Sequence, residues 1–130
     1  MAGVIVLDAS VLIAHLDAHD VHHARATALM LDAVDDVLAT SPLTLAEVLV
    51  GPARTGRADL AESAVRELGV RTIPLEADAP RELAELRVRT QLRLPDCCVI
   101  LAARTVGGYV ATFDDRLHRA AVELGLAAPG

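Results

Sequence analysis

Two acidic residues stand directly after the strands that the sequence predicts, where they could take part in chemistry. Asp8 follows the fully apolar run at residues 4–7, and Asp114 closely follows a second apolar run at residues 109–112. In open α/β sheets, ligands bind outside the carboxyl ends of the strands. We therefore expect both carboxylates to lie at the same edge of one sheet.

Two further carboxylates belong to predicted helices. Asp96 opens an apolar helix, so its side chain should project from the helix N-terminus. Glu47 lies one or two turns into a helix that begins at Ser41-Pro42, right after the second predicted strand. Four carboxylates from four segments are thus predicted to converge at one edge of the sheet.

Convergent carboxylates repel one another and resist joint ionisation. A hard divalent cation, Mg²⁺ or Mn²⁺, relieves this conflict, because it prefers oxygen ligands and leaves room for waters and phosphate. Such an ion can orient and deprotonate a water for in-line attack on a phosphodiester. The pattern therefore favours metal-dependent phosphodiester hydrolysis, which requires no His, Cys or Lys nucleophile.

Each acid taken singly also has a purely structural interpretation. Asp8 could be a turn or cap residue, and Asp114 could cap the last helix. Asp96 in a first turn is favourable with the helix dipole. Glu47 stands three residues after Thr44, the spacing of a capping box, unless the helix already begins at Ser41. The ordered set of four acids, two of them at strand ends, favours the metal site.

The elements that must position these acids alternate along the chain. Strands are predicted at residues 4–7, 37–40, 70–75 and 109–112. Helices are predicted at residues 10–16 with Ser10 as cap, 22–36, 42–50 ending at Gly51-Pro52, 57–68, 78–91, 95–106 and 114–124. This alternation indicates a three-layer α/β/α sandwich with a mostly parallel sheet of four or five strands, and one domain over residues 1–130.

The composition sets limits on the function. Apolar residues make up 53% of the chain, as in a folded globular protein. The net charge of −6 argues against bulk electrostatic binding of nucleic acid. However, all twelve basic residues are Arg, whose guanidinium group binds phosphate oxygens better than the ammonium group of Lys does. Adjacent Cys97 and Cys98 do not favour a disulfide, and no apolar run is long enough for a signal peptide or a membrane span. These features lead us to expect a cytoplasmic protein.

Several other classes with acids at strand ends do not fit. Receiver domains and haloacid-dehalogenase-type phosphatases both need a Lys, and the chain contains none. The first strand ends in D-x-S and not in the D-x-D of those phosphatases. No G-x-x-x-x-G-K segment is present, which excludes a P-loop enzyme.

Four segments together resemble the motifs of the PIN-domain family, in order, in spacing and over the whole chain. The first is V-I-V-L-D-A-S at residues 4–10, a strand followed by D-x-S, and the second is S-P-L-T-L-A-E-V at residues 41–48. The third is L-P-D-C-C-V-I-L-A-A at residues 94–103, and the fourth is A-T-F-D-D-R-L at residues 111–117. Each motif is weak alone, but the ordered set is specific.

The resemblance implies a metal-dependent endoribonuclease of the VapC type, the toxin of a toxin–antitoxin pair. Asp8, Glu47, Asp96 and Asp114 carry over as the acidic quartet that holds Mg²⁺ or Mn²⁺. Ser10 and Thr112 carry over as hydroxyls near the metal or phosphate, and Asp115 as an additional acid. Cys97-Cys98 departs from the small residues that the family often has at these positions.

The same resemblance implies the partners: an RNA substrate, a small VapB-like antitoxin that covers the acidic groove, and a second copy in a homodimer. Arg54 and Arg57, expected in the loop after the Glu47 helix, could contact RNA phosphate or simply be solvated. Two alternatives stay open: a catalytically silent PIN-like module that binds RNA or protein, and a nuclease whose target is structured DNA. The presence of all four acids favours the enzyme.

Overall fold

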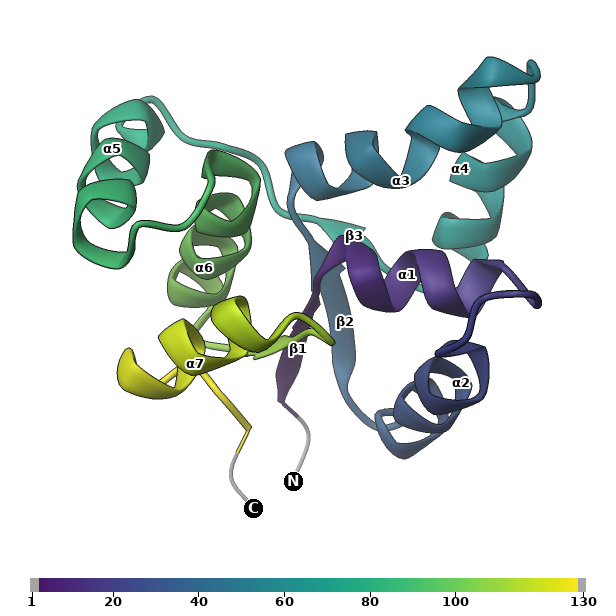
Figure 1. Ribbon diagram of the computed structural model, residues 1–130, viewed down its shortest axis with the longest axis horizontal. Helices are drawn as coiled ribbons and strands as arrows, with labels where there is room; N and C mark the ends of the chain where they lie inside the picture. Colours follow the sequence, from purple (N-terminus) through teal and green to yellow (C-terminus); the bar gives the residue numbers. More distant parts are fainter. Residues whose placement is uncertain (1–2, 129–130) are drawn as a thin grey trace.

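A parallel four-stranded sheet lies at the centre of the protein (Figure 1). The computed structural model describes residues 3–128. The strands are β1 (Val4–Leu7), β2 (Val37–Thr40), β3 (Arg71–Thr72) and β4 (Tyr109–Ala111), in the order β3-β2-β1-β4 with all pairs parallel. The predicted α/β architecture with a mostly parallel sheet is therefore confirmed. The third strand is shorter than the expected 70–75.

Seven helices are found in residues 3–128: α1 (Ala9–Leu16), α2 (His23–Asp32), α3 (Pro42–Arg54), α4 (Ala58–Glu67), α5 (Ala79–Thr90), α6 (Leu94–Val106) and α7 (Asp115–Glu123). Figure 1 shows α5, α6 and α7 on one side of the sheet and α1, α2 and α4 on the other. Two buried apolar clusters correspond to the two sides. The central strand β1 contributes Val6 to one and Leu7 to the other, as alternation along a strand requires.

Three predicted helix boundaries are wrong. The helix predicted at residues 22–36 is α2, which ends at Asp32, and Asp36 Oδ1 instead accepts from the N–H of Gly3 at 2.8 Å just before β2. Ser10 lies inside α1, and Asp8 occupies the N-cap position in its place. The helix that begins after Ser41 does not stop at Gly51-Pro52 but continues to Arg54. Pro52 lacks an N–H but still offers its carbonyl, which accepts from Arg57 N–H at 2.8 Å, so the chain turns away only at Gly56, where φ is +70°. The Ser41 cap is confirmed, since Ser41 Oγ accepts from Thr44 N–H at 3.0 Å.

The turn between α6 and β4 passes very close to β1, so residue 108 in this turn has no room for a side chain. A Cβ placed on Gly108 would lie 2.5 Å from the carbonyl oxygen of Val4. We expect Gly108→Ala to lower the free energy of unfolding by about 1–3 kcal/mol, because backbone must move. Gly51→Ala is the matched control: its Cβ meets nothing within 4 Å in a helix, so it should gain up to about 1 kcal/mol. Urea unfolding measures both, and equal stability of the two variants would contradict the prediction.

No helix within residues 3–128 is both long enough and apolar enough to cross a membrane.

Candidate active site

Asp8 is the buried centre of the site, at the carboxyl end of β1. Its side chain is 7% exposed, and its N–H donates to the carbonyl of Ala111 at the end of β4, at 3.0 Å. The β1–β4 register pairs Leu7 with Ala111, so the next residues along, Asp8 and Thr112, emerge side by side. The sheet edge predicted from the strand ends is thus where Asp8 lies.

Two hydroxyls hold a single oxygen of Asp8. Thr112 Oγ1 donates to Oδ2 at 2.8 Å, and Ser10 Oγ donates to the same oxygen at 2.9 Å. Each hydroxyl in turn accepts a backbone N–H: Thr112 from Asp114, and Ser10 from Phe113, both at 3.0 Å. The N–H donors fix the direction in which each hydroxyl proton points. Asp8 is therefore oriented through Oδ2, and no residue of 3–128 donates a hydrogen bond to its Oδ1.

Asp114 lies beside this network at the N-cap of α7. Its Oδ1 accepts from Leu117 N–H at 2.9 Å, so the structural role considered from the sequence is real. One oxygen engaged in a cap leaves the other available at the sheet edge. Asp115 is the exposed first residue of α7, and its predicted supporting role stays a prediction.

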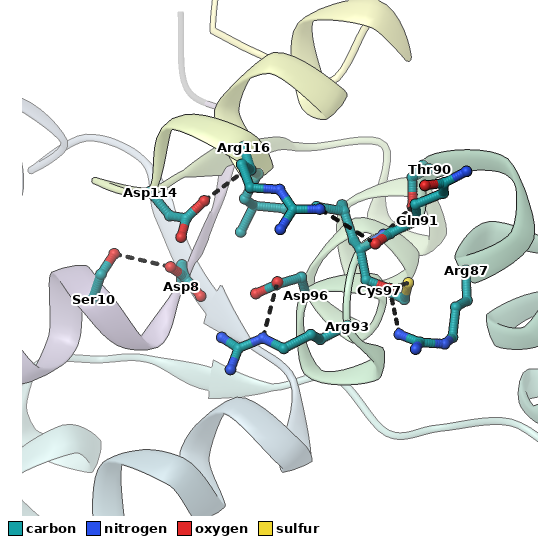
Figure 2. Close-up of polar contacts among 12 residues, drawn as sticks. Asp8, Ser10, Arg87, Thr90, Gln91, Arg93, Asp96, Cys97, Asp114 and Arg116 are labelled. Atoms are coloured by element: carbon teal, nitrogen blue, oxygen red, sulfur yellow. Dashed lines mark hydrogen bonds and ion pairs between the residues drawn. The ribbon is translucent and has the colours of Figure 1, made fainter.

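Asp96 faces Asp8 from the first turn of α6. Figure 2 shows the side chains of Asp8, Asp96 and Asp114 directed toward a shared space. The pKa of Asp96 is raised, first by burial and then by the charge of Asp8, with a smaller contribution from Asp114. Arg93, whose Nε lies 3.9 Å from Asp96 Oδ2, and Arg116 both oppose this rise. Like charges have been brought together here against their repulsion.

Glu47 completes the set from α3. It is the sixth residue of that helix, too far in to cap it, which excludes the capping-box interpretation. The pKa of Glu47 is raised by loss of hydration first, then by Asp8 and Asp96, while Arg93 lowers it. The influence of Asp8 and Asp96 on Glu47 places it in the same electrostatic site, although its side chain is more exposed than that of Asp8.

The carboxylates are neighbours without forming a ready-made coordination sphere. Within residues 3–128, no three His, Cys, Asp or Glu side chains are gathered closely enough to hold a metal ion together. Mg²⁺ does not require such a cage, because it usually keeps several waters and binds through one or two carboxylates. The donors here are all carboxylate oxygens, the type that Mg²⁺ and Mn²⁺ prefer. In donor chemistry, the residues present fit a hard divalent cation.

Two arginines at the site were not among the residues predicted from the sequence. Arg93 is the N-cap residue of α6 and pairs with Asp96, and Arg116 lies in the first turn of α7. Among the arginines, the sequence singled out only Arg54 and Arg57. The available signal was the i,i+3 spacing of Arg93 and Asp96 across a helix start, which brings the two side chains together.

Arg54 and Arg57 are not among the groups that shift the pKa of Glu47 or Asp96. Arg54 is the exposed last residue of α3, and Arg57 lines a cleft of about 520 Å³ between α1, α3 and α4. Glu47 lines the same cleft, whose remaining wall is mostly apolar and includes Ile13 and Leu60. A phosphate-binding role for Arg54 and Arg57 stays a prediction.

The two cysteines do not contribute ligands. Cys97 and Cys98 are buried and free, as the sequence predicts. Burial raises the pKa of both thiols, which disfavours the thiolate that binds metal. The site is an all-oxygen one.

The fold is found in solved structures of VapC and VapBC proteins. The chain is similar to VapC20 of Mycobacterium tuberculosis, a Sarcin-Ricin loop cleaving toxin, with TM-score 0.73 and 24% identity over 89% of this chain and 94% of that one. It is also similar to VapBC2 of Rickettsia felis, solved bound to a DNA fragment from their promoter (TM-score 0.66, 15% identity, 90% and 92% coverage). A third similar structure is PAE2754 of Pyrobaculum aerophilum (TM-score 0.59, 24% identity, 97% and 96% coverage).

The chain belongs to the PIN domain family, whose model matches residues 5–123. This match spans all four carboxylates and confirms the resemblance seen in the motifs. No curated protein matches the chain by sequence.

The raised pKa values of Glu47 and Asp96 predict how stability depends on pH when no metal is present. The folded state holds these protons more tightly than the unfolded chain, so stability should fall as pH rises from about 4 through the raised pKa values. At a pH above the raised pKa values, the full loss of stability from the two ionised carboxylates remains. At a pH below the pKa values of the unfolded chain, this loss is absent.

The pH prediction is checked by urea unfolding with chelator at a series of pH values. The double variant Glu47→Gln, Asp96→Asn serves as the reference, because it removes the two titrations and keeps the side-chain shapes. The difference in stability between wild type and double variant should move against wild type with increasing pH. A constant difference would show that repulsion among these carboxylates is negligible.

Proposed function

We propose that this protein is a metal-dependent endoribonuclease that acts as the toxin of a VapBC-type toxin–antitoxin pair. The observation that carries the proposal is the convergence of carboxylates on one edge of a parallel sheet, centred on Asp8. They come from the end of β1, from α3, from α6 and from the N-cap of α7. Joint ionisation of such a group is costly without a cation. A structural role alone does not account for a buried acid surrounded by other acids.

Asp8, Asp96 and Asp114, with Glu47, would hold the Mg²⁺ or Mn²⁺. When bound, the cation supplies charge stabilisation for the phosphate and lowers the pKa of a water that attacks it. Ser10 and Thr112 fix Asp8 through Oδ2, so that its other oxygen keeps one direction. Arg93 and Arg116 place positive charge beside the carboxylates, where they offset repulsion of an approaching phosphate.

RNA is the proposed substrate because the chain shares its fold with VapC20, a Sarcin-Ricin loop cleaving toxin. The alternative, a silent PIN-like module, is disfavoured by the complete acidic set. Loss of a single carboxylate would be enough to remove the metal site, and all four are present. Asp8 raises the pKa of both Glu47 and Asp96, and Asp114 raises that of Asp96.

The test is cleavage of a panel of cellular RNAs and a structured DNA by purified protein, with Mg²⁺, with Mn²⁺ and with excess chelator. Asp96→Asn is the control, since it keeps the shape and weakens the ligand. Metal-dependent RNA cutting that disappears in Asp96→Asn supports the proposal. A folded protein that binds RNA but cuts nothing under any condition would favour the silent module.

The antitoxin is proposed to seat an apolar segment with a basic residue in the cleft between α1, α3 and α4. Ile13, Leu16 and Leu60 are 40%, 38% and 70% exposed in this cleft, and Glu47 lies on its rim beside the acidic site. An apolar strip that ends at a group of carboxylates is complementary to an amphipathic helix whose basic side chain reaches the acids. Such a segment would also block the approach of RNA.

Leu60→Asp tests this docking surface, with Leu31→Asp as its matched control. Leu31 lies on α2 with an exposed fraction of 69%, nearly that of Leu60, and lines none of the clefts described here. Wild type and Leu31→Asp should co-elute with the proposed antitoxin, taken as the product of the neighbouring gene in the operon. Leu60→Asp should not co-elute with it. Co-elution of all three would move the antitoxin to another face, and co-elution of none would count against an antitoxin.

A homodimer remains part of the proposal, since two sites that face one channel would suit a long RNA. Light scattering at working concentration measures this directly, and a strictly monomeric protein would remove the dimer from the proposal without affecting the active site.

A further inference from the structure

A second cleft, which shares no lining residue with the apolar one, is lined by arginines. It has a volume of about 340 Å³ and lies between the end of α5 and helix α7. Arg89 comes from α5, and Arg116 and Arg119 come from one face of α7 at i,i+3 spacing. Leu92 and Ala120 form its floor, and Glu123 is the one carboxylate on its wall.

Arg116 joins this arginine cleft to the active site. Its Nη2 lies 3.5 Å from the carbonyl oxygen of Gln91, on the cleft side, while its charge lowers the pKa of Asp96 on the other side. Figure 2 shows Arg116 between Asp114 and Gln91, with Asp96 below it. A nucleic-acid strand that left the carboxylates past Arg116 would therefore meet the arginine cleft next.

The arginines of the cleft are not neutralised by the protein itself. Ion pairs within residues 3–128 are confined to Arg81–Glu85 and Arg93–Asp96, so Arg89, Arg116 and Arg119 have none. All three side chains are exposed. In a chain of net charge −6, three unpaired guanidiniums around one hollow mark a local site for an anion.

The chemistry of the cleft favours a sugar–phosphate backbone over bases. The chain has one Tyr, one Phe and no Trp, and neither aromatic residue lines this cleft, so bases have no ring to stack on. Guanidinium forks match phosphate oxygens in a bidentate manner. Arg116, which lines the cleft, also lies beside Asp114 and Asp96 (Figure 2), so the cleft begins next to the carboxylates.

We propose that the arginine cleft binds the RNA backbone on one side of the scissile bond, with Arg89 and Arg119 contacting phosphates beyond Arg116. This inference rests on the proposed ribonuclease function for its substrate. The inference adds a direction to the ribonuclease proposal. The RNA strand would run from the acidic site into the cleft between α5 and α7, and away from the apolar cleft between α1, α3 and α4.

The test is the double variant Arg89→Gln, Arg119→Gln against the matched control Arg66→Gln, Arg71→Gln. Both doubles remove two exposed positive charges, but Arg66 lies on α4 and Arg71 on β3, away from the cleft. Cleavage by the cleft variant should show a KM raised about tenfold, and the control should match wild type.

Binding of a fluorescent single-stranded RNA is measured in parallel, in Mg²⁺ and in an Asp96→Asn background that does not cut. The cleft variant should weaken binding about tenfold and make the dependence of log Kd on log salt shallower by about 1–2, as expected for two lost phosphate contacts. Polyglutamate serves as the acidic-protein probe and should bind poorly. Tighter binding of polyglutamate than of RNA, or equal RNA binding by the two doubles, would overturn the inference.

These outcomes separate the inference from the function on which it rests. If wild type cuts RNA and the cleft variant binds and cuts as well as the control, the proposed RNA-binding role of the arginine cleft is wrong. The proposed ribonuclease function is then unaffected. If wild type binds RNA through the cleft arginines but never cuts, the cleft stands and the proposed hydrolysis is wrong.

Discussion

Asp8→Asn is expected to lower RNA cleavage roughly a thousandfold while the protein stays folded. A cation at the scissile phosphate is worth several kcal/mol of transition-state stabilisation, and about 1.4 kcal/mol corresponds to a factor of ten. The amide of Asn is neutral and is a weaker ligand than a carboxylate for a hard cation. Its single oxygen can still accept from Ser10 and Thr112, so the local packing has no reason to change.

The same substitution should behave in the opposite way in a stability measurement. The charge of Asp8 raises the pKa of both Glu47 and Asp96, so its removal relieves repulsion in the metal-free protein. We expect Asp8→Asn to unfold at the same or a higher urea concentration than wild type with chelator, and to lose the stabilisation that Mg²⁺ gives wild type. An Asp8→Asn variant that cuts RNA as fast as wild type would show that the metal site is wrongly assigned.

The sequence was sufficient to place the acids because strand ends are easy to recognise. Asp8 follows four apolar residues with no polar interruption, and a run of that kind has few interpretations other than a buried strand. The parallel register then determines that Asp8 and Thr112 meet, which the structure confirms. Glu47 depended on the helix start at Ser41-Pro42, and that cap is also confirmed.

The features that the sequence could not provide depend on side-chain direction or on competition between weak signals. The Gly51-Pro52 pair weakens a helix, but the carbonyl of Pro52 remains able to close one more turn, so the helix ended later than expected. Ser10 has the right residue type for a cap, yet its hydroxyl accepts from the N–H of Phe113 and donates to Asp8 Oδ2.

The arginine cleft was beyond sequence reasoning for a different reason. Arg89 and Arg119 are thirty residues apart in the chain and belong to different helices. Helices α5 and α7 pack on the same side of the sheet (Figure 1), and only this arrangement lets both arginines line one cleft. A helix with evenly spread charges gives no indication of which arginine will meet another element.

Thr112→Val is the second substitution with a large expected effect. It removes the hydroxyl that orients Asp8, a proposed metal ligand, although in our proposal this hydroxyl itself contacts neither metal nor RNA. Valine fills the same volume, but it cannot donate to Asp8 Oδ2 or accept from the N–H of Asp114. Hydrogen-bond partners of metal ligands typically contribute a factor of 10–100 in metal affinity or activity. We expect cleavage at fixed Mg²⁺ to fall by about that factor.

The matched control is Thr112→Ser, which keeps the hydroxyl and should recover most of the activity. The diagnostic measurement is the Mg²⁺ concentration needed for half-maximal cleavage, which should rise in Thr112→Val and remain near the wild-type value in Thr112→Ser. A merely structural role would instead lower the activity of Thr112→Val equally at all Mg²⁺ concentrations. Because Ser10 still holds the same oxygen of Asp8 at 2.9 Å, the double variant Ser10→Ala, Thr112→Val should lose more than either single change, since no hydroxyl then orients the central carboxylate.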